Sequence, residues 1–182
     1  PPDSDEAGYI GSEKSLLMAG AVYSGDNFSV EAWNYRVEDF LNSLYLYGDY
    51  SFAGTPGGYR YTMVAQYTDQ RDVGGNIGGT VDTWHWGLGL RAAGRASSWF
   101  VSYNRVAYDE GSYDGGTLFV RWGTPQMFNS VQVQDSELAG TKSWGAGFQY
   151  DFGLDGILRG TVARWRLGFY DLPDKLHLAD AR

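Results

Sequence analysis

The sequence has no cysteine in its 182 residues, which excludes a disulfide scaffold and cysteine-ligated zinc. It also has no apolar run approaching the roughly 18–20 residues that a membrane-spanning helix needs, so an α-helical membrane protein is excluded. Basic residues are few, with 14 Lys and Arg against 22 Asp and Glu, and the net charge is −8. Because nucleic-acid binding requires clustered cations that neutralise phosphates, that function is excluded too.

Glycine and aromatic residues are abundant instead, with 26 Gly, 14 Tyr, 9 Phe and 7 Trp. The segments between the Gly, Asp and Asn clusters alternate between apolar and polar residues with period two, which is typical of β-strands. Most of these segments reach the about 9–11 residues that a tilted strand needs to cross a bilayer, whereas soluble strands usually have about 5–6. We therefore expect ten strands, at 14–23, 27–37, 41–52, 58–70, 81–93, 96–108, 116–122, 127–134, 141–152 and 157–170.

The two faces of these strands differ in chemistry. In 81–93, Trp84, Trp86 and Leu88 share one face, and Thr83 and His85 share the other. Such alternation also occurs in soluble β-sandwiches, where the apolar face packs inside. Here the apolar faces carry Trp or Tyr near the strand ends and smaller aliphatic residues between them, as in a lipid-facing barrel wall. The sequence therefore predicts an all-β fold, an antiparallel transmembrane β-barrel. In 27–37 both faces are partly apolar, which a β-bulge would explain.

Connection lengths alternate between short and long, as they do in outer-membrane barrels. A tight turn at 124–126 between two short strands preserves this alternation, and it is the basis for counting ten strands. We expect one β-barrel region over residues 1–170, with 171–182 as a tail or an external loop. Because the C-terminal residues lack the aromatic residue that closes such barrels, we expect the barrel region to be incomplete.

Several short runs resemble the middle strands of OprD-type porins. They are FSVEAWNYRVED at 28–39, then Asn42, Tyr45 and Asp49-Tyr50, AQY at 65–67, Tyr103-Asn104, FNSVQ at 128–132, Trp144 and Tyr150-Asp151. The resemblance extends over about residues 15–170 and implies a barrel of about 18 strands, of which this chain covers about strands 7–16. It also implies passive, partly selective uptake of small hydrophilic solutes, often carboxylates, past a ladder of lumen-facing arginines.

The face assignments supply such a set of inward basic residues. They are Arg60, Arg91, Arg121, Arg164 and Arg166, and His85 also points into the expected lumen. Charged rows in a pore select ions by sign, and arginine offers carboxylates a bidentate fork. The alternative is that these arginines pair with Asp49 and Asp151 and merely brace the wall. Arg36 and Arg105 lie on strands whose faces the sequence does not assign.

Catalytic patterns are weak, because the only histidines are His85 and His177 and no nucleophile or metal-ligand spacing accompanies them. We predict no catalytic residue, metal or cofactor. The alternatives left open are an outer-membrane barrel enzyme and a closed structural or receptor barrel. The expected location is the bacterial outer membrane, and the expected partners are its lipid and small solutes, with a homo-oligomer left open and no nucleic acid.

Overall fold

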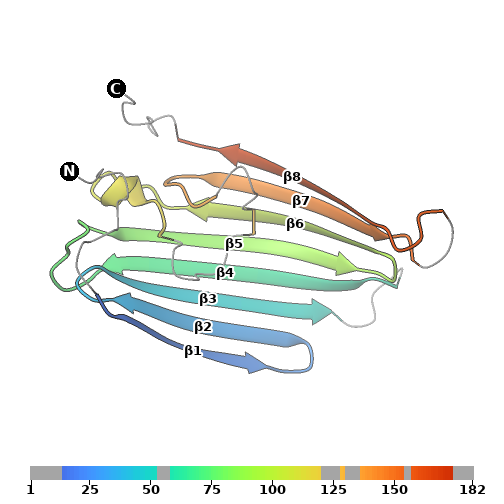
Figure 1. Cartoon of the computed structure of the whole chain (residues 1–182), viewed down its shortest axis with the longest axis horizontal. Coiled ribbons are helices and arrows are strands. Elements are labelled where there is room, and N and C mark those ends of the chain that lie inside the picture. Colours follow the sequence, from blue (N-terminus) through green and yellow to red (C-terminus); the bar gives the residue numbers. More distant parts are fainter. Residues whose placement is uncertain (1–13, 53–57, 120–127, 130–135, 154–156, 174–182) are drawn as a thin grey trace.

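The computed structural model describes residues 14–52, 58–119, 128–129, 136–153 and 157–173, and these form one antiparallel sheet in chain order (Figure 1). The strands are β1 (Leu16–Ser24), β2 (Phe28–Val37), β3 (Leu41–Phe52), β4 (Arg60–Asp72), β5 (Asp82–Ala93), β6 (Ser97–Val106), β7 (Lys142–Asp151) and β8 (Val162–Asp171). A short 3-10 turn, η2 (Tyr113–Gly116), lies between β6 and β7. Within the described residues, no helix is long and apolar enough to span a membrane.

The sheet has eight strands, so the prediction of ten is wrong. Of the two extra segments, 116–122 and 127–134, the described residues 116–119 and 128–129 are not in strands. Residues 120–122, 127 and 130–134 lie outside the described residues. The reason is that β6 pairs directly with β7, from Ser97 opposite Tyr150 to Arg105 opposite Lys142. This pairing leaves no place in the sheet for strands between them. The described residues between these two strands, 107–119, 128–129 and 136–141, contain no strand, and we call them the 107–141 connection.

The strand pairing is regular throughout the described sheet. In β2 and β3, for example, the pairing runs without interruption from Phe28 opposite Tyr50 to Val37 opposite Leu41. The bulge hypothesis for 27–37 is therefore wrong. Both faces of β2 carry apolar residues because Tyr35 and Val37 are buried on one face, where Val37 packs against Phe40 and Val81.

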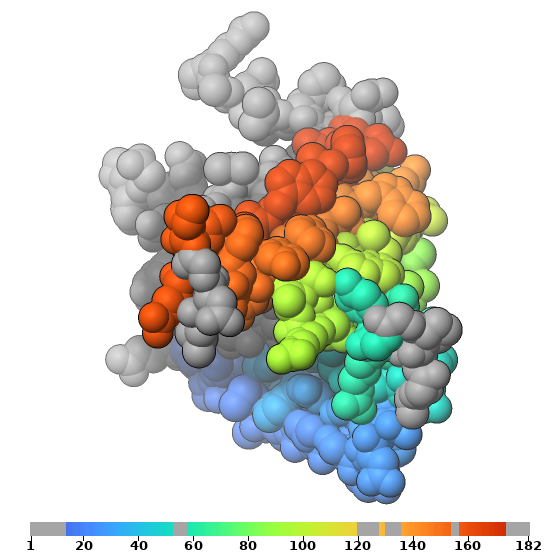
Figure 2. All heavy atoms as spheres, turned by 90° about the vertical axis from the view of Figure 1, so that its right-hand side faces the viewer, coloured from blue at the N-terminus to red at the C-terminus, as the bar shows by residue number. Residues whose placement is uncertain are grey.

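The connections divide between the two ends of the sheet. We call one end the turn rim, which holds the described residues 25–27, 58–59, 94–96, 152–153 and 157–161 (Figure 1, right). The other end is the connection rim, which holds 38–40, 73–81 and 107–141. Figure 2 looks onto the turn rim, with the strands following one another in colour order from β1 to β8. In the described sheet β1 and β8 lie at opposite edges, and whether the barrel region is incomplete remains a prediction.

One face of the sheet, the outer face, is apolar and largely exposed. Near the connection rim it carries Tyr67, Trp84, Trp86, Tyr103, Trp144 and Phe169, and near the turn rim Tyr50, Phe52, Tyr61, Trp99, Phe148 and Trp165. Between these belts the exposed residues are aliphatic, such as Met63, Leu88 and Val101. Two aromatic belts that flank an aliphatic band are the surface that a lipid bilayer requires. The predicted apolar faces of 81–93 and 141–152 both lie here.

Candidate functional site: the lumen face

The opposite face, which we call the lumen face, gathers four of the predicted arginines near the turn rim. Two adjacent cross-strand rows hold them. One row runs Arg60, Ala93, Ser98, Gln149, Arg164, and the next runs Thr62, Arg91, Phe100, Gly147, Arg166. The arginines therefore come from β4, β5 and β8 and share one end of the wall.

Three of these arginines, Arg91, Arg164 and Arg166, line one hollow of about 580 Å³ together with Phe100 and Gln149. Arg164 donates from Nε to Gln149 Oε1 at 2.9 Å. The Arg166 guanidinium carbon lies 5.4 Å from the centroid of the Phe100 ring, a cation–π distance. The ring occupies the space over Gly147, where an added Cβ would approach it to 2.2 Å. The glycine therefore makes room for the ring that positions Arg166.

The four arginines differ from the ion-paired basic residues in their surroundings within the described part of the wall. Among the described residues, no carboxylate lies within ion-pair distance of any of them. Asp151, one of the two acids considered as braces, instead accepts a hydrogen bond from the backbone N–H of Gly153 at 2.8 Å. The other, Asp49, interacts with the Tyr47 hydroxyl, and Arg91 lies near enough to that hydroxyl to interact with it electrostatically.

The remaining two predicted residues differ from this group. Arg121 lies outside the described residues. His85 faces the lumen side, as predicted, but its side chain is only 1% exposed. Its ring Nε2 lies 3.5 Å from Gln66 Nε2, and it forms a second contact with Asn104. The structure therefore places Arg60, Arg91, Arg164 and Arg166 in two adjacent rows, with Arg60 four strands from Arg164 and outside the hollow that the other three line. It leaves His85 in a buried polar layer nearer the connection rim.

That polar layer is covered by the 107–141 connection, which folds across the lumen face. Gln70 of β4 donates from Nε2 to the Phe119 carbonyl at 2.8 Å, and its Oε1 accepts from the Phe119 backbone N–H at 2.8 Å. Gln70 Nε2 also donates to the Ser43 hydroxyl at 3.1 Å. One buried amide side chain thus satisfies both backbone groups of Phe119, as a neighbouring strand would.

Asn129 holds the same connection against β6 and β7. Its Oδ1 accepts from the Ser102 hydroxyl at 2.5 Å, and its Nδ2 donates to the Ser143 carbonyl at 2.8 Å. Gly145 lies beneath it, and a Cβ there would come within 2.4 Å of Asn129 Oδ1. Sequence reasoning missed Asn129 and Gln70 as anchors, because isolated amides in alternating segments carry no local signal of a distant partner.

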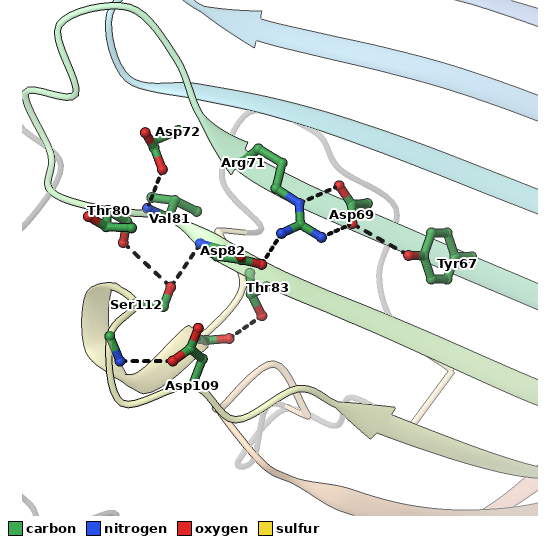
Figure 3. Close-up of polar contacts among 12 residues, drawn as sticks. Tyr67, Asp69, Arg71, Asp72, Thr80, Val81, Asp82, Thr83, Asp109 and Ser112 are labelled. Carbon is green, nitrogen blue, oxygen red and sulfur yellow. Dashed lines mark hydrogen bonds and ion pairs between the residues drawn. The ribbon is translucent and has the colours of Figure 1, made fainter.

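At the connection rim, polar contacts attach the 3-10 turn and its flanking residues to the end of the sheet (Figure 3). The Ser112 hydroxyl accepts from the backbone N–H of Asp82 at 2.9 Å, and the Thr83 hydroxyl donates to the Gly116 carbonyl. Phe40, Val81 and Phe119 pack together beside these contacts. The described part of the connection is therefore fixed to the wall by both polar and apolar contacts.

A surface ion pair joins Lys14 to the turn at 38–40 on this rim. Lys14 Nζ lies 2.8 Å from Asp39 Oδ2, and the other Asp39 oxygen accepts from the Gly75 backbone N–H at 3.0 Å. The hydrogen bond from Lys14 lowers the pKa of Asp39 from its usual value, and the hydrogen bond from Gly75 adds to this effect. The same ion pair raises the pKa of Lys14. Because Gly75 belongs to the next connection, Asp39 links 38–40 to 73–81.

Comparison with known proteins assigns the family. Residues 6–158 match the model of the OprD family of outer-membrane porins, and this match covers most of the chain. The chain therefore belongs to the OprD family of outer-membrane porins, proteins of the bacterial outer membrane. No curated protein sequence matches it.

Solved structures show the same fold. OprD from Pseudomonas aeruginosa aligns with a TM-score of 0.63 and 21% identity, over 78% of this chain and 36% of that one. OpdK, solved with vanillate, aligns with a TM-score of 0.66 and 18% identity over 86% of this chain and 43% of that one. OpdO from Pseudomonas aeruginosa aligns with a TM-score of 0.67 and 18% identity, over 86% of this chain and 40% of that one. The chain thus spans less than half the length of these porins, and its sheet has the fold of part of their barrel walls.

Proposed function

We propose that this wall lines a passive channel for small hydrophilic solutes, and that its lumen arginines favour anionic solutes, carboxylates in particular. The observation that carries the proposal is the group formed by Arg60, Arg91, Arg164 and Arg166. They lie in two adjacent rows with no ion-paired carboxylate among the described residues. An unneutralised cationic row attracts anions, and each guanidinium can offer a carboxylate two parallel hydrogen bonds.

Two further observations support this function. The chain belongs to a family of porins, and OpdK, a relative of the same fold, was solved with vanillate, which carries a carboxylate. The 107–141 connection covers the lumen face toward the other rim, so a solute would pass the arginines where the wall is open. We also infer a channel rather than an enzyme, since the His85 contacts are to the side chains of Gln66 and Asn104 and not to an acid–nucleophile pair.

The test is the ion selectivity of the full-length protein in planar bilayers, with Arg91→Gln and Arg166→Gln as single variants. A unit charge about 5 Å from a passing ion contributes about 0.8 kcal/mol in a water-like medium, which is a roughly fourfold preference. Each variant should therefore lower the anion-to-cation permeability ratio by about two- to fourfold. The uptake of benzoate should fall with it.

The matched control is Arg36→Gln, which removes the same charge from the outer face near the connection rim. It should leave selectivity and benzoate uptake unchanged. If the lumen variants behave like this control, the arginines do not guide solutes and only shape the wall.

A further inference from the structure

All outward-pointing basic residues of the described strands lie at the connection rim. They are Arg36, Arg71, Arg105 and Lys142, and all four are exposed. The outer face at the turn rim carries aromatic residues instead, and no described strand residue there is charged on that face. The two rims of the lipid-facing surface therefore differ in charge, although the bilayer surrounds both.

Within this set, Arg71 is already neutralised. Its guanidinium lies between Asp69 and Asp82 and forms an ion pair with each (Figure 3). Arg36 lies beside the turn at 38–40 and interacts electrostatically with Asp39. These two cations have carboxylate partners within the protein.

Arg105 and Lys142 differ, because they are directly opposite each other on β6 and β7. Like charges in directly opposite positions destabilise a sheet. Among the described residues, Arg105 forms no ion pair with a carboxylate, and its guanidinium carbon instead lies 5.9 Å from the centroid of the Trp84 ring. Lys142 Nζ is 3.8 Å from Asp171, but both side chains are more than half exposed, so this pair is weak. A bound anion between the two cations would remove their repulsion.

The depth of this pair in the membrane indicates the kind of anion. The next outward row toward the middle of the sheet contains Tyr103 and Trp144, whose ring centroids are 4.6 Å apart, and Trp144 is 60% exposed. Aromatic belts mark the boundary between hydrocarbon and headgroups. Two residues along a tilted strand correspond to about 5 Å of depth, so Arg105 and Lys142 lie about 5 Å nearer the headgroups than Trp144. Trp86 of the same aromatic belt is directly opposite Arg105, so the two cations lie at the level of the belt, where their long side chains can extend to the headgroup phosphates.

We propose that Arg105 and Lys142 bind the phosphate of an anionic lipid in the leaflet that surrounds the connection rim. The two cations hold the phosphate, and the Trp144 ring, one row nearer the middle of the sheet, contacts the lipid below it. The Trp84 ring lies on the rim side of Arg105 and holds its guanidinium in place. The binding fixes an anionic lipid on the wall between β6 and β7, where the 107–141 connection leaves the sheet. This site is separate from the lumen face and does not depend on which solute the channel passes.

The experiment measures lipid selectivity in the full-length protein by native mass spectrometry, from micelles that contain equal amounts of phosphatidic acid and phosphatidylcholine. The wild-type protein should retain phosphatidic acid with a preference on the order of tenfold. Arg105→Gln combined with Lys142→Gln should reduce this preference to near one. The charge-conserving exchange of Arg105→Lys with Lys142→Arg should keep most of it.

The matched control removes two exposed cations from the turn rim, with Arg95→Gln and Arg159→Gln, and should keep the preference. An equal loss in this control would mean that only total charge matters, which overturns the site. An unchanged preference in the Arg105 and Lys142 double variant also overturns it, and a changed oligomer mass in that variant would assign the surface to a protein partner. If the double variant does not fold, the single variants should each lower the preference by about threefold.

Discussion

The two rims of the sheet place their positive charge on opposite faces. At the turn rim, Arg60, Arg91, Arg164 and Arg166 are on the lumen face and the outer face is aromatic. At the connection rim the cations are on the outer face, and the lumen face carries buried neutral groups such as Gln70, Thr83 and Asn104. The difference shows that a strand end can hold arginine on either face if water or headgroups reach it. A neutral, hydrogen-bonded lumen surface is needed only where the connection covers the wall.

The largest expected effect tests how the cost of placing a charge on the outer face depends on its depth in the bilayer. Met63→Arg places a charge in the aliphatic band between the aromatic belts, where it should lower the free energy of unfolding by about 2–4 kcal/mol. Leu44→Arg places the same charge on the same face beside Asp69 near the connection rim, where the cost should be about 0–1 kcal/mol. Urea titration of the full-length protein in lipid vesicles measures both. Equal costs would mean that the assignment of depth is wrong.

A smaller effect is expected from separating the connection from the wall. Asn129→Ala removes the acceptor of the Ser102 hydroxyl and the donor to Ser143, which leaves buried polar groups unpaired at about 1–3 kcal/mol. Gly145→Ala should act in the same direction by displacing the Asn129 amide. Amide hydrogen exchange should rise in residues 107–119 and 136–141 but not in β1 or β2.

The control for this prediction is Thr62→Ala, on the lumen face near the turn rim. Its hydroxyl bonds to Ser51 at 2.9 Å and does not touch the connection. It should leave exchange in the connection unchanged. Two results would show that Asn129 does not hold the connection. One is faster amide hydrogen exchange of the connection in the Thr62→Ala control, and the other is an unchanged exchange rate in Asn129→Ala.

The smallest effect concerns the surface ion pair between Lys14 and Asp39. Because the pKa of Asp39 is lowered in the folded protein, its contribution to stability is present above the ordinary carboxylate pKa and is lost as the pH falls through the lowered value. Asp39→Asn should therefore remove a slight acid dependence of the thermal unfolding temperature and change little at neutral pH. Asp114→Asn, at an exposed position of the 3-10 turn, is the comparison. A large change in the thermal unfolding temperature of Asp39→Asn near pH 7 would contradict the view that this ion pair contributes little to stability.

Much of the wall was predictable from local sequence. Strand positions agree with the alternating segments to within about two residues, except that β8 begins at Val162 rather than at residue 157, since pleating sends neighbouring side chains to opposite faces. The same alternation correctly put Arg60, Arg91, Arg164 and Arg166 on one face. It failed for Trp33, Tyr35 and Val37, whose lumen-facing positions are apolar. Val37 packs with Phe40 and Val81, and Phe119, distant in sequence, packs against the same cluster. The Trp33 ring lies over Gly20 of β1, where a Cβ would leave it no room.

The sequence by itself therefore determined the class of fold, the faces of most strands and the family, because alternation and short motifs are local properties of the chain. Only the tertiary structure decided that β6 pairs with β7 and that 107–141 is a connection rather than two further strands. The segment around Leu118 and Phe119 is apolar enough to form a strand. Whether it does depends on its hydrogen-bond partners, and Gln70 satisfies the Phe119 backbone in place of a neighbouring strand.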